Sequence, residues 1–472
     1  MLRAMTGSLI ALAVYVGLQL GIGLWVSRNI RDEEDYLLGG RTFGPILVTA
    51  SVFATWFGAE TCVGAAGEIY EYGPAAVSSD PFGYGICLLL VGLLLAAPLW
   101  RRGLVTLADL FRDRYSPLVE RVVAMVLIPS SLLWAAAQIR AFGSVVASAG
   151  DVSPELGMLV GAAVVLVYTS LGGLRADAIT DVLQGGVLIV TLVALGALAL
   201  GDVGSIEAGA QAAIGAPATA PPSMLARVDA WVIPVIGSLF AQELVSRVCA
   251  SRSPAMARGG TIAAAAIYML VGSIPVALGL IARSVLPELS SGDLVLPSLA
   301  RHYLGELGFV IFAGALVSAI LSTVDSALLA CGSLLAHNLL PARLREGTPD
   351  VALRVARLCV VALAMVAYAL AHGGESVHEL VEVSSAFGGA GVTVVAGFAL
   401  FTRRAGGVSA ALGSLAAGGG VWLWLGLVEE MDGAYVWSLA GALGVYGVIA
   451  GAERVFSRWR RGVSSRPPRA PE

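Results

Sequence analysis

The sequence predicts an all-α, polytopic membrane protein, and three observations support this prediction. Hydrophobic residues make up 57% of the 472 residues, only 13% are charged and the mean hydropathy is +0.83, whereas soluble domains carry about 25% charged residues. Apolar runs of about 20 residues, long enough to cross a bilayer as helices, recur along the whole chain. Arginines gather in alternate connecting loops. Lipid is therefore the expected solvent, and the small net charge of -4 argues against a nucleic-acid partner.

Apolar runs between polar breaks predict thirteen spans. The first run, residues 5–27, is too long for a cleaved signal peptide and lacks a small-residue cleavage site, so we expect a retained helix. The other spans are expected near 43–69, 78–100, 117–148, 154–173, 176–200, 228–250, 259–284, 305–339, 351–371, 377–402, 406–427 and 433–456. A disordered cytoplasmic tail is expected at 457–472.

Arginine placement predicts the orientation, because short, positively charged loops stay in the cytoplasm. The opposite loops, such as EIYEYGPAAVSS and AHGGESVHE, carry almost no arginine. We therefore expect a multi-pass protein of the plasma (inner) membrane with its N-terminus outside and its C-terminus in the cytoplasm. The arginines of the cytoplasmic set are Arg28, Arg31 and Arg41; Arg101, Arg102, Arg112, Arg114 and Arg121; Arg175; Arg247, Arg252 and Arg258; Arg343, Arg345, Arg354 and Arg357; Arg403 and Arg404.

Two of the spans contain sequences that favour a broken helix. The second has glycines and small residues around a buried acid, in ATWFGAETCVGAAG, and the seventh has Pro234 and Gly237 in WVIPVIGSLFAQEL. Broken helices at corresponding positions of two halves indicate a transporter site at the bilayer midplane. Here the two five-helix halves would be 43–200 and 228–402, with an extra helix at 1–27 and two more at 406–456. Glycines that only allow close helix packing are the alternative.

Three segments resemble the sodium:solute symporter family over most of residues 33–404: DYLLGGRTFGP, YTSLGGLRADAITDVLQ and SAILSTVDSALLACGSLLAHNL. Within that family, ATWFGAE, GLVTLADLFRDRYS, WAAAQIRAFG and QELVSRV are most similar to choline transporters and their bacterial relatives. The resemblance implies thirteen spans, a LeuT-type inverted repeat and sodium-coupled symport of a small organic solute by alternating access. No organic cofactor is expected, and the oligomeric state stays open, with a monomer favoured.

The resemblance also implies a sodium site between the second and ninth spans. Sodium is a hard cation that prefers several oxygen ligands, which unwound backbone and hydroxyl side chains supply. The matching positions are the carbonyls of Ala54, Phe57 and Ala319 and the hydroxyls of Ser322 and Thr323.

Some relatives hold a second sodium ion, so one ion is expected here and a second is left open. This sequence has an aspartate at position 325 where some members have serine, and whether Asp325 binds an ion, a proton or an arginine is also left open. The matching positions for the second ion are Asp181, Ser322, Asp325 and Ser326.

The solute site is expected where charges and aromatic rings fall inside spans. A charge within a membrane helix costs at least about 2.5–3.5 kcal/mol, so such residues are paired or functional. Aromatic faces attract cations, and the resemblance matches Trp56, Tyr84 and Trp134 to walls of the choline pocket, but it matches a fourth tryptophan to Ala241. We expect a small cationic or zwitterionic amine, with Arg140 as charge partner of one acid. The expected solute residues are Trp56, Glu60, Asp80, Tyr84, Trp134, Phe240, Gln242 and Glu243.

Other functional classes are less well supported. The four histidines have no metal-ligand spacing and the five cysteines no CxxC pair, so we expect neither an enzyme nor a metal centre other than sodium. A sodium- or solute-binding sensor and a symporter of sugars or monocarboxylates remain the alternatives.

Overall fold

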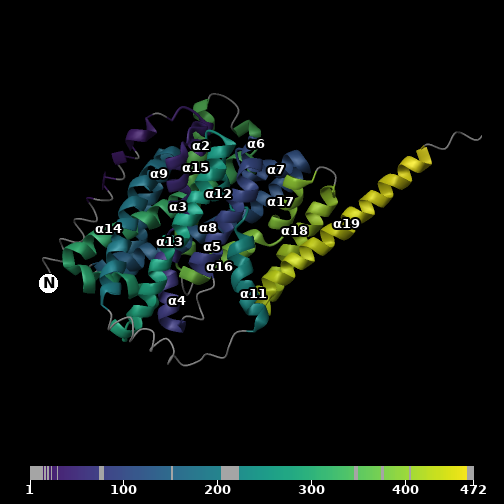
Figure 1. Cartoon of the computed structure of the whole chain (residues 1–472). Helices are drawn as coiled ribbons and strands as arrows, with labels where there is room; N and C mark the ends of the chain where they lie inside the picture. The colour runs from purple at the N-terminus through teal and green to yellow at the C-terminus, as the bar shows by residue number, and fades with distance from the viewer. Residues whose placement is uncertain are drawn as a thin grey trace, which may run out of the picture.

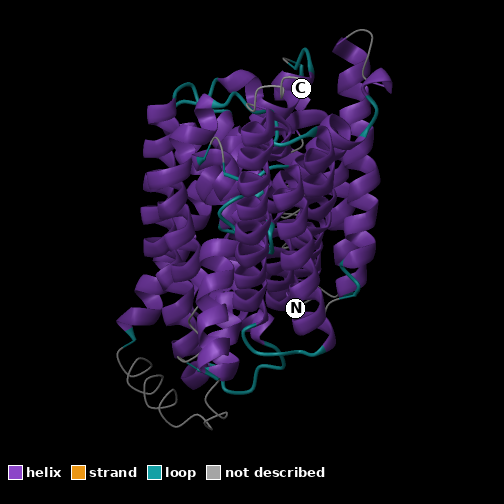
Figure 2. Ribbon diagram, turned by 90° about the vertical axis from the view of Figure 1, so that its right-hand side faces the viewer, coloured by secondary structure: helices purple, strands orange, loops and turns teal. Residues whose placement is uncertain are grey.

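The protein is a bundle of helices that run roughly parallel to one another (Figure 2). The computed structural model describes residues 30–73, 79–149, 152–202, 223–344, 349–373, 377–402 and 405–464, together with scattered residues between 14 and 28. No strand is formed within these ranges, and the one isolated bridge joins Phe43 to Ser251. The longer helices are labelled in Figure 1: α2 (Glu33–Leu38), α3 (Pro45–Trp56), α4 (Ala65–Tyr72), α5 (Tyr84–Leu90), α6 (Ala96–Arg101), α7 (Leu107–Arg114), α8 (Pro117–Ala149), α9 (Pro154–Gly201), α11 (Met224–Val232), α12 (Gln242–Cys249), α13 (Pro254–Val285), α14 (Val295–Ser333), α15 (Pro349–Leu370), α16 (Val377–Gly389), α17 (Val392–Phe401), α18 (Val408–Trp422) and α19 (Ala434–Ser464).

Membrane-spanning helices account for most of the predicted spans. In the described part of the chain nine helices are long and apolar enough to cross a bilayer, and two bent pairs, α3 with the helix from Glu60 to Tyr72 and α16 with α17, raise the number to eleven. The predicted span at 154–173 contains a shorter apolar helix, Pro154–Val167. Most of the span predicted at 5–27 lies outside the described residues. The all-helical membrane architecture is confirmed, while the number thirteen remains a prediction.

Two predicted spans meet directly at a glycine. The runs at 154–173 and 176–200 form two helical segments, labelled together as α9, which are separated at Gly173 by a non-helical backbone conformation (φ +57°, ψ -175°). A side chain at Gly173 would place its Cβ 2.7 Å from the Tyr36 carbonyl oxygen. Glycine is therefore needed at this position both for its backbone conformation and for the close approach of α2.

One predicted boundary agrees with the structure and two are corrected. The span predicted from 305 starts at a non-helical glycine, Gly305 (φ +66°, ψ -176°), and the label α14 also includes the helical arm that precedes it from Val295. The span at 377–402 is bent by 46° between α16 and α17, where Gly391 has a φ of +84°. Helix α19 continues to Ser464, so residues 457–464 do not belong to a disordered tail. Residues 465–472 lie outside the described part.

At one end of the bundle, residues such as Arg41 and Arg252 donate hydrogen bonds to carbonyl oxygens of neighbouring segments. We call this end the arginine-rich face. The Arg41 guanidinium donates to the carbonyls of Gly103 and Leu104, each at 3.1 Å. Beside it, the Phe43 N–H donates to Ala250 O at 3.0 Å, and the Arg252 N–H returns a bond to Phe43 O at 3.0 Å. These bonds hold the start of α3 against the end of α12. Helix α3 precedes the predicted break in the second span, and α12 follows the predicted break in the seventh span.

Candidate functional site

The second span is broken in the middle of the bundle. Helix α3 ends at Trp56, the backbone leaves helical geometry at Phe57 (φ -86°, ψ 64°), and the chain resumes at Glu60 after a bend of 56°. The Ala59 N–H, which the break leaves without a helical acceptor, donates to Gln138 Oε1 on α8 at 2.9 Å. The interruption predicted from the glycine-rich sequence is therefore present, and α8 stabilises it.

Oxygen atoms from α3 and α14 converge next to this break. The Thr323 hydroxyl lies 3.3 Å from Ala54 O and 3.1 Å from Ala319 O, and all three residues are buried. Two carbonyls and a hydroxyl in a dry site are ligands of the kind that a hard cation prefers. The structure therefore brings together three of the residues that the resemblance matched to a sodium site.

Gly58 allows this close approach. A Cβ at position 58 would lie 2.7 Å from Thr323 Oγ1 and 2.8 Å from Gln138 Oε1. Neither Gly58 nor Gln138 was among the predicted site residues, although the sequence ATWFGAE placed a glycine directly after the predicted break.

The other hydroxyl matched to the sodium site points toward a cluster of acids. Ser322 donates a hydrogen bond to Asp181, and Ser51 on α3 donates to the same carboxylate at 2.7 Å. Asp181 is fully buried. Ser322 is therefore next to Thr323 in the chain and bonded to Asp181, so it is positioned to serve the predicted ion or the second ion that was left open.

Two further acids and an arginine complete the cluster. Arg247 on α12 forms a buried ion pair with Asp177 and also donates to Ser326, which lies 3.1 Å from Asp177. Asp325 lies close to the side chains of Thr169 and Asp177, without standard hydrogen-bond geometry within the described residues, and within electrostatic range of Asp181 and Arg247. Asp177 and Arg247 were not predicted site residues. Arg247 pairs with Asp177 and also lies within electrostatic range of Asp325, so whether Asp325 binds an ion, a proton or an arginine stays open.

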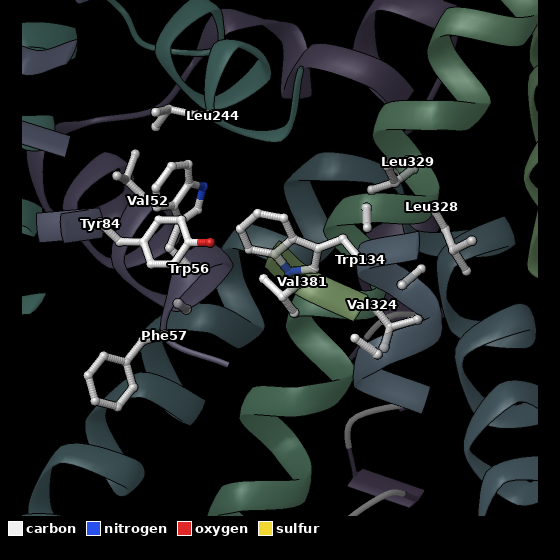
Figure 3. Packing of buried hydrophobic residues seen from close by; sticks show 14 of the residues in the cluster. Val52, Trp56, Phe57, Tyr84, Trp134, Leu244, Val324, Leu328, Leu329 and Val381 are labelled. Atoms are coloured by element: carbon white, nitrogen blue, oxygen red, sulfur yellow. The ribbon is translucent and has the colours of Figure 1, made fainter. Parts of the chain in front are cut away.

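Three aromatic rings predicted for the solute site form a triangle (Figure 3). The ring centroids of Trp56 and Tyr84 lie 5.4 Å apart, those of Trp56 and Trp134 5.7 Å, and those of Tyr84 and Trp134 6.2 Å. These distances are typical of direct ring–ring contact. The triangle joins the break in the second span, the third span and α8.

Two acids flank the triangle. Asp80 is 2.9 Å from the Thr61 hydroxyl and 3.0 Å from the Tyr268 hydroxyl, and Glu60 lies beside Asp80 and the Tyr84 hydroxyl. Both carboxylates are at most 5% exposed. Two acids are thus held close together next to aromatic faces, an arrangement that favours a positive ligand.

Arg140 has an acid nearby that was not predicted. It lies within electrostatic range of Asp293, in the 3-10 turn Gly292–Leu294 before α14. The expected pairing of Arg140 with Glu60, Asp80 or Glu243 stays a prediction.

The break in the seventh span brings a further acid to the same region. After the turn Ile233–Gly237 the chain unwinds, and α12 restarts at Gln242. Phe240 and Glu243 line a small cavity together with Trp134. Gln242 points elsewhere: its side chain accepts from the Leu107 N–H at 2.7 Å and donates to Ser246 at 3.0 Å, so it holds α7 in place and does not line the cavity.

Comparisons with known proteins agree with this geometry. The model of the family described as "Sodium:solute symporter family" matches residues 36–418. The human high affinity choline transporter 1 is 28% identical over 372 residues, which cover 72% of this chain and 63% of that protein. The sodium/glucose cotransporter of Vibrio parahaemolyticus is 25% identical over 357 residues, 67% of this chain and 65% of the relative. The chain thus spans less than two thirds of the length of these relatives.

Solved structures share the fold. A substrate-bound, outward-open state of a Na+-coupled sialic acid symporter superposes with a TM-score of 0.76 at 19% identity, covering 94% of this chain and 98% of the other. The closed conformation of Mhp1, a nucleobase-cation-symport-1 family transporter, superposes with a TM-score of 0.61 at 17% identity over 90% and 95% of the two chains. The resemblance noted in the sequence is confirmed by these matches, and the chain belongs to the sodium:solute symporter family.

Proposed function

We propose that this protein is a sodium-coupled symporter that carries a small organic solute by alternating access. The observation that carries the proposal is the meeting of the Thr323 hydroxyl with the Ala54 and Ala319 carbonyls, directly beside a broken helix and the aromatic triangle. An ion bound there, with the Phe57 carbonyl and Ser322 as further ligands, would hold α3 and α14 in one arrangement. Family membership supports the same reading.

Coupling follows from the shared position of the two sites. Sodium would stabilise the break at Trp56–Gly58, and this break carries one wall of the solute site. The free energy by which bound sodium strengthens solute binding must equal the free energy by which bound solute strengthens sodium binding. Rocking of the two halves, 43–200 and 228–402, around the occupied centre would then expose the site to either side of the membrane in turn. The arginine-rich face would be cytoplasmic, with the N-terminus outside.

Loss of the Thr323 hydroxyl is expected to weaken sodium binding selectively. Thr323→Ala removes one ion ligand, and a hydrogen bond or ligand to a charged group contributes about 1.5–3 kcal/mol, so apparent sodium affinity should fall at least about tenfold. Solute binding at saturating sodium should change much less. Sodium titrations of solute binding measure both quantities.

Thr323→Ser is the matched control, because it keeps the hydroxyl and should stay close to the unmodified protein. Ser322→Ala should weaken sodium binding as well. Unchanged sodium dependence in both alanine variants would remove this site from the mechanism.

We propose a second sodium site at Asp181, Ser322, Asp325 and Ser326. Among the described residues of this region, three buried carboxylates share the Arg247 guanidinium, so a bound cation would balance part of the remaining negative charge. Asp325→Asn and Asp181→Asn are each expected to lower the number of sodium ions carried per solute. Reversal potentials in proteoliposomes measure this ratio, and a ratio of one in the unmodified protein would mean that no second ion is transported.

We propose that the solute is a small amine, for which the supports are the aromatic triangle and the acids Glu60 and Asp80. The named choline transporters among the relatives are in keeping with this class, whereas the alanine at position 241 leaves choline itself without one expected wall. The rings touch one another in this structure, so a cation would have to part them or bind on one side. The proposed path of the solute lies within one membrane-embedded chain. A monomer is therefore sufficient for the mechanism.

Truncation of Trp56 is expected to cost more affinity than its replacement by phenylalanine. A desolvated cation–π contact contributes about 2 kcal/mol, so Trp56→Ala should raise the solute Kd about thirtyfold or more. Trp56→Phe keeps a π face and should cost at most about tenfold. Equal losses in the two variants, measured by solute titration at saturating sodium, would exclude a face-on cation contact.

A thermal-shift screen of the purified protein tests the function as a whole. Amines, amino acids, sugars and carboxylates are each added with sodium and with potassium in its place. A stabilisation by an amine that requires sodium, followed by sodium-driven accumulation of that amine in vesicles, is the expected result. Sodium-dependent binding of a sugar or a monocarboxylate would favour the alternative symporter class, and binding without accumulation would favour a sensor.

A further inference from the structure

An open groove lies between α3, the part of α9 after Gly173 and α13, three helices that pack against one another (Figure 1). Its volume is about 380 Å³, within the range of about 300–1,000 Å³ that is typical of small-molecule sites. Residues that line it include Pro45, Ile46 and Phe53 of α3, Val182 and Gly186 of α9, and Ile267 of α13.

The groove lies on a lipid-facing side of the bundle. All three helices belong to membrane-spanning segments. Ile46 in the groove is 74% exposed, and Val190 on α9 and Leu270 on α13, close to lining positions of the same helices, are 67% and 74% exposed. The hydrocarbon region of a bilayer contains no water that could fill such a groove. Its occupant must therefore be largely apolar.

Gly186 keeps part of the groove open. A Cβ at this position would have no neighbour within 4 Å, so the glycine is not required for the packing of α9 against another helix. At the adjacent Gly185, by comparison, a Cβ would meet the Phe53 ring at 3.5 Å, an ordinary contact. The space beside Gly186 is thus available to a molecule from outside the described chain.

The acid in the groove does not require a charged ligand. Asp181 lines the groove and is fully buried. One of its carboxylate oxygens accepts a hydrogen bond from Ser51 at 2.7 Å, and the other accepts from Ser322. Both oxygens are therefore already satisfied from within the protein.

Two arginines lie near the end of the groove at the arginine-rich face. The Arg252 side chain donates to Thr42 O at 2.6 Å, three residues before Pro45. Arg175 precedes Val182 by seven residues, so it lies on the same side of α9 and about 10 Å nearer to that face. Both arginines are exposed, and neither forms an ion pair within the described residues. An apolar groove thus leads to two guanidinium groups that are free to bind an anion.

We propose that this groove is a phospholipid site, in which one acyl chain of an anionic phospholipid lies against α3, α9 and α13 while its phosphate binds Arg175 and Arg252. Guanidinium groups bind phosphate through paired hydrogen bonds, and arginines near a membrane surface attract anionic lipids. The lipid would touch the helix that carries the Ala54 carbonyl, since Phe53 lines the groove. The inference does not depend on which ion or solute the protein carries.

Other occupants fit the groove less well. A lipophilic cation would be repelled by the two guanidinium groups and would find the oxygens of Asp181 already bonded. A zwitterionic phospholipid would bring the positive charge of its head group close to the same arginines. A sterol offers a single hydroxyl and no negative charge, so it would leave both guanidinium groups without an anion.

A phosphatidylglycerol with a diazirine in one acyl chain tests the position of the site. The full-length protein in detergent is irradiated with this lipid, and the labelled peptides are identified by mass spectrometry. We expect adducts within 45–53 and 182–189. Unlabelled phosphatidylglycerol should compete at least about tenfold better than phosphatidylcholine, because each arginine near a membrane surface favours an anionic lipid by about fivefold.

Filling the groove should remove the acyl chain. Gly186→Leu places a side chain in the open space, and since lipid tails are as apolar as leucine and bind by packing alone, the adducts should fall by at least about tenfold. Gly447→Leu on α19 is the matched control, because position 447 is also exposed and a Cβ there has no neighbour within 4 Å. It should keep the adducts of the unmodified protein.

Arginine variants test the phosphate contact. Arg175→Gln combined with Arg252→Gln should bring the competition ratio of the two phospholipids close to one, and Arg175→Gln alone should lower it by about fivefold. Arg258→Gln is the control: Arg258 is exposed but lies on the opposite side of α13 from Ile267, nine residues away. A single symmetrical peak in size-exclusion chromatography verifies that each variant is folded.

The outcomes decide between this site and ordinary lipid contact. Adducts spread over all lipid-facing helices, or unchanged adducts in Gly186→Leu, would mean that only annular lipid is present and would overturn the proposal. Equal competition by both phospholipids in the unmodified protein would overturn the phosphate contact, and stronger competition by a cationic double-chain amine would overturn it in favour of a ligand of Asp181. Sodium and solute are absent from these measurements, so a negative result leaves the proposed symport untouched.

Discussion

Replacement of Gly58 by alanine is expected to abolish most of the sodium affinity of this protein. The new Cβ would lie 2.7 Å from Thr323 Oγ1 and 2.8 Å from Gln138 Oε1, both inside van der Waals contact. Gln138 is held in place by the Ala59 N–H, and Thr323 is part of the long helix α14. To relieve the clash, either the Thr323 hydroxyl and the Gln138 amide turn away, which removes the Thr323 ligand and the bond to Ala59, or the break itself moves away from α8 and α14.

Such a shift would pull the Ala54 carbonyl away from Thr323 and open the set of oxygens. Sodium ligands act at fixed short distances, so a displacement of a few tenths of an ångström at two ligands should raise the apparent sodium Kd by about one hundredfold or more. Sodium titration by thermal shift and by solute binding measures the effect.

The matched control is Gly64→Ala in the same span. A Cβ at that position has its nearest neighbour at 3.9 Å, the Cγ of Glu60, and should be accepted with little change. If Gly58→Ala retained the sodium affinity of the unmodified protein, the ion would not bind between Ala54 and Thr323.

The positions of the helix breaks were predictable from sequence because glycine and proline act locally. Pro234 and Gly237 in the seventh span and Gly58 in the second weaken the helix locally. Proline alone is not sufficient, since Pro129 in α8 and Pro275 in α13 lie inside continuous helices. The convergence of Ala54 with Thr323 was not predictable from local sequence, because the two residues are 269 positions apart. It was expected only because the motifs resembled those of a family.

Contacts between distant side chains were the part that sequence did not reveal. The pairing of Asp177 with Arg247 leaves no periodic pattern, and the same arginine was assigned to the cytoplasmic loops from its charge alone. Gln242 was placed with the solute residues because it adjoins the break, yet its side chain turns toward the Leu107 N–H. Closeness to a break in the sequence does not determine the direction of a side chain at the residue where the helix restarts.

The bend between α16 and α17 was missed for a related reason. The run 377–402 is apolar on both sides of the bend, and the glycines near 389–391 resemble those that merely allow helices to pack closely. Only the positive φ of Gly391 distinguishes the two cases, and hydropathy carries no information about it.

Loss of the Arg247 guanidinium is expected to be the most destabilising single change among the charged residues of the core. Arg247→Met would leave Asp177, Asp181 and Asp325 buried with no guanidinium beside them. Breaking a buried ion pair by removing one partner costs about 3–5 kcal/mol. The unfolding midpoint of the purified protein should fall accordingly, and added sodium should restore part of the stability because it supplies a positive charge to the same cluster.

A second substitution tests whether charge balance is the cause. Arg247→Met combined with Asp177→Leu removes both members of the pair and replaces them with apolar side chains, a change that is often neutral in protein interiors. The double variant should therefore recover most of the stability lost by Arg247→Met, while Asp177→Leu alone leaves the guanidinium unpaired and should be destabilising. Glu306→Gln is the control at an exposed pair, 3.8 Å from Arg301, where the expected cost is at most about 1 kcal/mol. If the double variant were no more stable than Arg247→Met, the role of Arg247 would lie in its bonds to Ser326 and to the Glu243 carbonyl, which the double variant also lacks, rather than in balancing the three acids.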